Sequence, residues 1–164
     1  MTWTLPNRYQ FQALKLWHAA FSGAFLVAYV SDDVYAMHAF AGYLVLALTV
    51  VRLVVGYLAK PPSPLALTNP KTAFLDWLEK RQNGKKARNP LYAGLAALLL
   101  GSIFLAGASG WLADGFSVFE GLHEGLAEMT PAFIAAHVGF VLFKPVKKYL
   151  VSFMTGLNNP PIPQ

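Results

Sequence analysis

The apolar residues of the chain gather in four long stretches, separated by polar segments. These stretches cover approximately residues 14–30, 34–58, 91–113 and 119–143. At about 1.5 Å per residue, each can cross a hydrocarbon core of roughly 30 Å as a helix, the first only just. None shows the apolar–polar alternation of a barrel strand, and a helix pairs all its backbone groups internally. The pattern predicts an all-α membrane protein built as a four-transmembrane-helix bundle.

The longest polar region lies between the second and third stretches, at residues 59–90. Within it, Asn69 followed by Pro70 is typical of a helix start. The apolar side of such a helix would be formed by Phe74, Leu75, Trp77 and Leu78. The pair Asn83-Gly84 would end it. The loop is therefore predicted to contain a short helix lying at the membrane surface.

The amino-acid composition also indicates a membrane protein. Hydrophobic residues make up 55% of the 164 residues and charged residues only 13%, whereas soluble domains have about 25% charged residues. There is no cysteine, which excludes disulfides, thiolate-bound iron–sulfur clusters and haem attached through a C-x-x-C-H motif. We expect residues 1–164 to form a single membrane domain.

The charges are distributed unequally between the two predicted membrane sides. All 13 Lys and Arg lie on one side, mostly in the 59–90 loop and near the two ends of the chain. The two opposite loops carry only acidic charges, at Asp32, Asp33, Asp114 and Glu120. The positive-inside rule then predicts that both termini are cytoplasmic. The formal charge of +5 indicates topology and contact with anionic lipid rather than nucleic-acid binding.

The chain has four histidines, His18, His38, His123 and His137, and all lie in predicted spans or at their edges. Ionisable side chains are costly in a membrane and are functional candidates by default. Distance from the flanking charges places His38 and His123 near the outer face and His18 and His137 in the inner half. The histidines therefore form two layers, with two different helices contributing to each.

The spacing of His123 and His137 indicates what they bind. Their 14-residue separation is about 21 Å along a helix and returns the side chain to nearly the same face. A single ion needs all its ligands at about 2 Å, so the pattern favours two stacked planar cofactors. We predict two haem b groups with axial ligand pairs His18/His137 and His38/His123. Small residues that would leave room nearby are Ser22, Gly42, Gly107, Gly110 and Gly139, although such residues also serve ordinary helix packing.

The role of each of three further ionisable residues can be interpreted in two ways. Arg52 follows His38 by 14 residues and would reach the propionates of the inner haem; alternatively it extends to the inner headgroups. Glu124 and Glu128 would accept protons at an outer-side quinol site; alternatively they belong to a solvated helix start, where acidic residues are favourable.

Three segments carry a family resemblance: MHAFAGYLVLALTVVRLVVGYL (37–58), the Asn89-Pro90-Leu91 entry to the third span, and GLHEGLAEMTPAFIAAHVGFV (121–141). They resemble the bacterial cytochrome b561 / nickel–iron hydrogenase b-type cytochrome subunit family, over nearly the whole chain. The resemblance implies a four-helix, di-haem cytochrome of the bacterial inner membrane that exchanges electrons with quinone. It also implies ligands and a propionate partner at His18, His38, His123, His137 and Arg52. One departure is Ala87-Arg88, where members often have Gly-His.

The expected function is electron transfer between the quinone pool and a periplasmic-side redox partner, with no catalytic side chain assigned. The acidic outer loops would dock a basic c-type cytochrome or a redox-enzyme subunit. Alternatives are a stand-alone superoxide:quinone-type oxidoreductase, which would need a basic outer patch, and the membrane-anchor subunit of a hydrogenase or dehydrogenase. A metal transporter would need carboxylates among the imidazoles at mid-depth. The resemblance alone does not identify the partner.

Overall fold

The computed structural model describes residues 7–61, 63–83 and 90–154, and the side chains of residues 8–61, 63–83 and 90–143. The described elements are α1 (Asn7–Val30), α2 (Tyr35–Leu58), α3 (Pro70–Gln82), α4 (Leu91–Ala113), a 3₁₀ turn (Ser117–Phe119) and α5 (Glu120–Met154). Four helical segments are long and apolar enough to cross a membrane, and they lie in α1, α2, α4 and α5. The predicted all-α architecture with four spans is therefore confirmed.

The observed helix bounds agree closely with the apolar pattern, except at two helix ends. Helix α4 spans the predicted residues, and α2 begins one residue later than expected. Helix α1 begins at Asn7 rather than near residue 14. The fourth predicted stretch, residues 119–143, agrees with the apolar span, which ends at Phe143, but the helix α5 itself continues through Pro145 to Met154. A proline removes one backbone hydrogen bond, and here that loss does not stop the helix.

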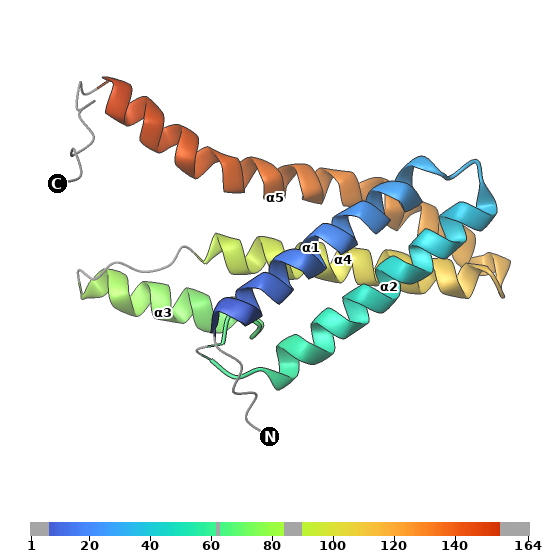
Figure 1. Ribbon diagram of the computed structural model, residues 1–164, viewed down its shortest axis with the longest axis horizontal. Coiled ribbons are helices and arrows are strands. Elements are labelled where there is room, and N and C mark those ends of the chain that lie inside the picture. Colours follow the sequence, from blue (N-terminus) through green and yellow to red (C-terminus); the bar gives the residue numbers. More distant parts are fainter. Residues whose placement is uncertain (1–6, 62, 84–89, 155–164) are drawn as a thin grey trace.

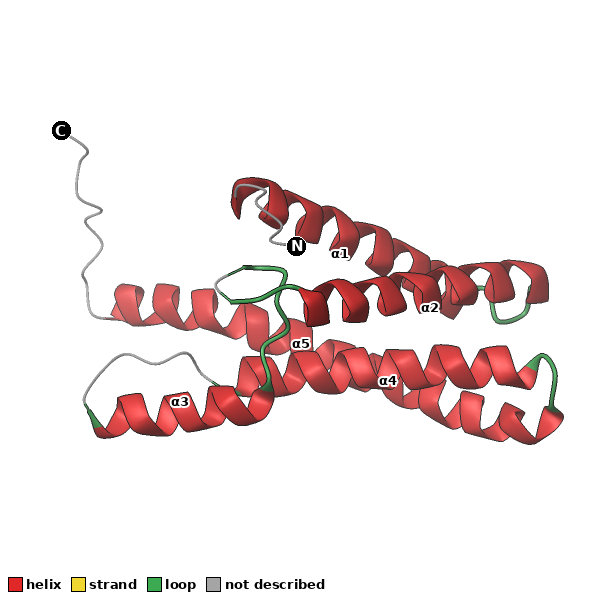
Figure 2. Cartoon of the chain, turned by 90° about the horizontal axis from the view of Figure 1, so that it is seen from below, coloured by secondary structure: helices red, strands yellow, loops and turns green. Residues whose placement is uncertain are grey.

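The helices pack in the order α1–α2–α4–α5, each against the next. Figure 2 shows the first three of these from top to bottom, and Figure 1 shows α5 diverging from α4 towards its C-terminal end. Within the described part of the chain, the backbone of α1 approaches only α2, and the backbone of α5 approaches only α4 and the adjoining 3₁₀ turn. The bundle is therefore open between α1 and α5.

The buried apolar core is small. Ala24, Val45 and Ile103 form its centre, where α1, α2 and α4 meet. Large apolar side chains elsewhere are exposed, as Tyr57 is by 86% and Leu16 by 75%. Helices in lipid gain little from hiding apolar surface from one another, so exposed outer faces are expected. A thin core also leaves space inside the bundle.

Hydrogen bonds connect α1 to α2 and α2 to the loop that follows it. The indole Nε1 of Trp17 donates to the Leu48 carbonyl at 3.0 Å. At the far end of α2, Arg52 Nη1 donates to the Leu65 carbonyl at 2.8 Å, and the Leu67 amide donates to the Gly56 carbonyl at 3.1 Å. The loop after α2 therefore folds back against the end of its own helix.

The short helix predicted in the 59–90 loop is present as α3. The Asn69 side chain accepts a hydrogen bond from the Lys71 amide at 2.9 Å, and Pro70 occupies the first turn. This is the N-cap arrangement that the sequence predicts, since the amides of a first helical turn lack helical partners. The helix ends at Gln82, just before Asn83; Gly84 lies outside the described residues.

The contact between α2 and α4 depends on a glycine. A Cβ atom placed on Gly107 would lie 3.2 Å from Cβ of Leu46. We expect Gly107→Leu to lower the free energy of unfolding by about 1–3 kcal/mol, because overpacking forces neighbouring groups apart. The measurement is denaturant unfolding in detergent, followed by circular dichroism. Gly101→Leu on the same helix is the control, since its Cβ meets nothing within 4 Å; equal losses in both variants would contradict the expectation.

Candidate functional site

His38 and His123 lie next to each other, although they are far apart in the chain. Each is the fourth residue of its helix, His38 in α2 and His123 in α5. Their ring centroids are 5.9 Å apart and their planes cross at 71°. The fold therefore brings together two of the four histidines that the sequence singles out, in the pair that their depths predict.

A backbone carbonyl fixes the orientation of each ring. Nδ1 of His38 donates to the Ala28 carbonyl at 2.8 Å, and Nδ1 of His123 donates to the Ala106 carbonyl at 2.9 Å. Because a carbonyl can only accept, Nδ1 must carry the hydrogen in both rings. The lone pair then lies on Nε2. Both imidazoles are thus held in the tautomer that can bind a metal through Nε2.

The sequence provides these carbonyls for local reasons. Ala28 lies in the last turn of α1, where the carbonyls have no partner within the helix. Ala106 lies inside α4, and access to it depends on Gly110. A Cβ atom at Gly110 would come within 2.9 Å of Cε1 and 3.0 Å of Nδ1 of His123. Gly110 therefore allows the imidazole to lie against the α4 backbone.

Two cavities adjoin the histidine pair, with volumes of about 370 and 520 Å³. Both are lined by His38, Gly42, Gly107 and His123. The smaller continues between α2, α4 and the start of α5, and the larger continues among α1, α2, α4 and α5. The available space thus extends in two directions from the rings, and its size is typical of cofactor sites.

The ring separation fits one metal ion between the two imidazoles. Metal–nitrogen bonds of about 2 Å, plus about 1 Å from nitrogen to ring centre on each side, give a centroid distance of roughly 6 Å. The observed distance is 5.9 Å. Within the described ranges, no group of three or more His, Cys, Asp or Glu could hold a metal ion.

His18 and His137 lie on α1 and α5, the two helices that border the opening in the bundle. Nδ1 of His18 lies 3.2 Å from the Ser22 hydroxyl, which can accept or donate a hydrogen bond. Among the described residues, His18 has a side-chain hydroxyl as its neighbour, whereas His38 and His123 each have a backbone carbonyl.

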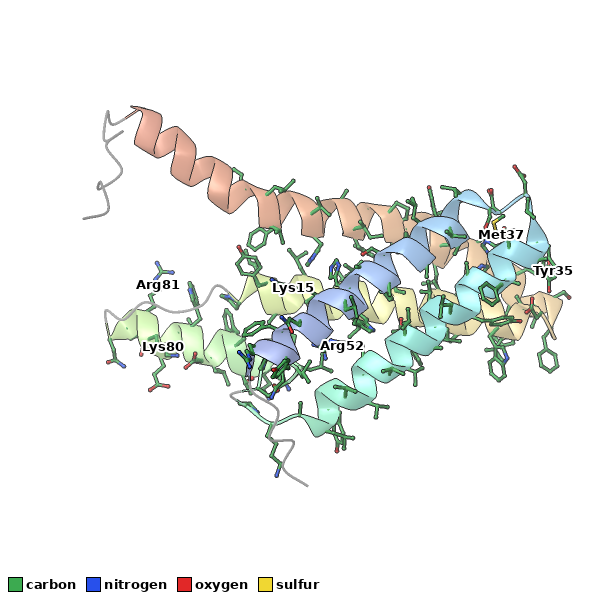
Figure 3. All side chains as sticks on the ribbon, viewed as in Figure 1. Lys15, Tyr35, Met37, Arg52, Lys80 and Arg81 are labelled. Atoms are coloured by element: carbon green, nitrogen blue, oxygen red, sulfur yellow. The ribbon has the colours of Figure 1, made fainter. Side chains whose placement is uncertain are left out.

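Arg52 is half-buried and lies beside Trp17 of α1. Its guanidinium carbon lies 5.9 Å from the ring centroid of Trp17, and the Trp17 and His18 ring centroids are 6.3 Å apart. Figure 3 shows Arg52 and Lys15 well away from Tyr35 and Met37, which mark the other end of the bundle. The bond to Leu65 engages one of the five guanidinium N–H donors.

Carboxylates surround the His38/His123 pair. Asp32, Glu124 and Glu128 line the larger cavity, and Asp114 and Glu120 line the smaller one. The described residues that line the two cavities include no Lys or Arg.

Two features of this site are absent from the sequence-based prediction. One is the hydrogen bond from the Tyr35 hydroxyl to Asp114 at 3.0 Å, which joins α2 to the end of α4. The other is the pair of carbonyl acceptors. The sequence does indicate Ala28 as an acceptor. This residue lies in the last turn of the span that precedes His38, where backbone carbonyls have no partner within the helix.

Comparison with known proteins identifies one family. The family model for prokaryotic cytochrome b561 matches residues 7–156. This range includes all four spans, the four histidines and Arg52. No curated protein and no solved structure gives a significant match.

The position of the His123 ring should depend on Gly110. We expect Gly110→Val to displace the ring from the Ala106 carbonyl, because the added Cβ overlaps Cε1. In protein prepared without haem, side-chain ¹⁵N shifts should show Nδ1–H for His38 and His123, and the variant should lose this signature at His123 alone. Gly101→Val is the control, since its Cβ has open space. An unchanged His123 signature in Gly110→Val would contradict the assigned hydrogen bond.

Proposed function

The chain belongs to the prokaryotic cytochrome b561 family, and from this premise we propose that it carries electrons across the bacterial inner membrane through two b haems. The family is one of multi-pass membrane cytochromes that transfer electrons through b-type haem. When bound, haem supplies a reversible one-electron couple; the protein supplies ligands, orientation and a low-dielectric surrounding.

The observation that carries the proposal is the geometry of His38 and His123. The imidazoles have ring centroids 5.9 Å apart and each donates from Nδ1 to a carbonyl, so both would hold the iron of one b haem through Nε2. The adjoining cavities, with Gly42 and Gly107 in both linings, supply the space that a macrocycle needs. We assign one haem to this pair.

A second haem is assigned to His18 and His137. The support is their position on the two helices that border the open side of the bundle. Further support is the 14-residue spacing of His123 and His137, which corresponds to about 21 Å along α5. Arg52 has guanidinium donors beyond the one on Leu65, and these suit the propionate of this haem.

The exchange partners follow from the chemistry at the two ends. A centre that carries one electron at a time can exchange electrons with quinone, which dissolves in the membrane. It can also exchange electrons with a protein that docks outside the membrane. The partner-side surface carries Asp32, Asp33, Asp114 and Glu120 and no basic residue. This charge favours a basic periplasmic partner, such as a c-type cytochrome or a redox-enzyme subunit, over an anion such as superoxide.

The haem assignment predicts two distinct centres. Purified protein should contain two haem b per chain, visible as b-type bands in the reduced-minus-oxidised spectrum. His38→Ala and His123→Ala should remove or perturb the same centre, and His18→Ala and His137→Ala the other, because each iron loses one axial ligand. One haem per chain, or loss of the same centre in all four variants, would contradict the assignment.

The charge asymmetry predicts the orientation. Reporter fusions at both termini should behave as cytoplasmic, because the 13 basic residues lie on that side. An alkaline phosphatase fused after Asp33 or Asp114 should be active, as it is only in the periplasm. An active phosphatase at either terminus would reverse the topology.

A further inference from the structure

We propose that Trp17 is a positioning residue for the His18/His137 centre. Its indole holds helix α1 against α2 and thereby sets the position of the His18 imidazole. The inference rests on the proposed function, in that His18 binds haem. It concerns a residue that acts on the centre only through the helix that carries the ligand. The contacts of the indole and the attachment of α1 to the rest of the bundle support it.

Helix α1 depends on α2 for its position. Among the described residues, the backbone of α1 approaches only α2. Side-chain hydrogen bonds join the two helices at two levels. Trp17 Nε1 donates to the Leu48 carbonyl at 3.0 Å, and His38 Nδ1 donates to the Ala28 carbonyl at 2.8 Å. Ala28 lies 11 residues beyond Trp17, about 16 Å along the helix, whereas His18 follows Trp17 directly. The bond from Trp17 is therefore the nearer of the two to His18.

The indole of Trp17 contacts two successive turns of α2. Its N–H donates to the carbonyl of Leu48, and the guanidinium carbon of Arg52, four residues further along α2, lies 5.9 Å from its ring centroid. A guanidinium at this distance is attracted to the face of an indole. On α1 itself the indole stacks on Phe21, with ring centroids 4.9 Å apart and planes at 23°. Together these contacts restrict both the rotation of α1 and its shift along α2.

The side chain that orients the His18 ring belongs to the same helix. Nδ1 of His18 lies 3.2 Å from the hydroxyl of Ser22, one turn further along α1. This contact can orient the ring on its helix, but it cannot place the helix. By contrast, the His123 ring of α5 has its carbonyl partner, Ala106, on α4. Binding groups must be held to within about 0.5 Å of their productive geometry, so a shift of α1 would displace His18 from its haem.

The test compares haem-loaded wild-type protein with Trp17→Phe, which keeps an aromatic ring and removes the indole donor. Electron paramagnetic resonance of the oxidised protein reports the ligand geometry of each low-spin haem, and His137→Ala and His123→Ala identify which signal belongs to which centre. In Trp17→Phe, the signal of the His18/His137 centre should shift or broaden. The haem of that centre should also be lost about fivefold faster, the ratio that one ordinary net hydrogen bond gives. The other signal should stay unchanged.

Trp77→Phe on α3 is the matched control, because among the described helices the backbone of α3 approaches only α4. It should change neither signal. A second measurement needs no haem. Since the chain has no cysteine, Leu16→Cys and Tyr57→Cys, both at exposed positions, can carry spin labels on α1 and α2. In haem-free protein, the distribution of distances between the labels should broaden in Trp17→Phe.

The outcomes separate the inference from the proposed function. An unchanged His18/His137 signal, equal changes at both centres, or an unchanged distribution of label distances would each overturn the role of Trp17, while the di-haem function would stand. A protein with no haem or one haem per chain would overturn the proposed function itself. The label distances would still show whether Trp17 holds α1 in place.

Discussion

The hydrogen bond from an imidazole Nδ1 to a backbone carbonyl is the interaction on which the site depends. Hydrocarbon offers no water to pair a polar ring, so an imidazole in a membrane span needs a protein acceptor. His38 finds one at Ala28 and His123 finds one at Ala106. Each bond settles the tautomer and the ring orientation together. The two Nε2 atoms are thereby available for a ligand held between α2 and α5.

The open bundle follows from weak packing forces between helices in lipid. Without a hydrophobic drive to close the structure, contacts form where small residues allow close approach, as at Gly107 against Leu46 and Gly110 against His123. Elsewhere the interior is not filled, and among the described residues the backbones of α1 and α5 do not approach each other. The empty volume inside the bundle and the small apolar core therefore have the same cause, which is the weak packing force between helices in lipid.

Much of the architecture could be predicted because it is local. Apolar runs placed α4 at residues 91–113, and an Asn-Pro pair placed the start of α3. The end of α5 could not be read in the same way, since leaving the hydrocarbon does not require a helix to stop, and one proline does not force it to. Arg52 was expected from its spacing to point towards a propionate; its bond to Leu65 depends on how the following loop folds back.

The sequence alone determined the four spans, because a long apolar run is enough to identify a helix that can cross a membrane. The two histidine layers and the separation of acidic from basic ends stay predictions from the same pattern. Only the tertiary structure decided which carbonyl orients each imidazole and where the cavities lie. Those contacts join residues on different helices, such as His123 and Ala106, and depend on helix crossings that no local pattern encodes.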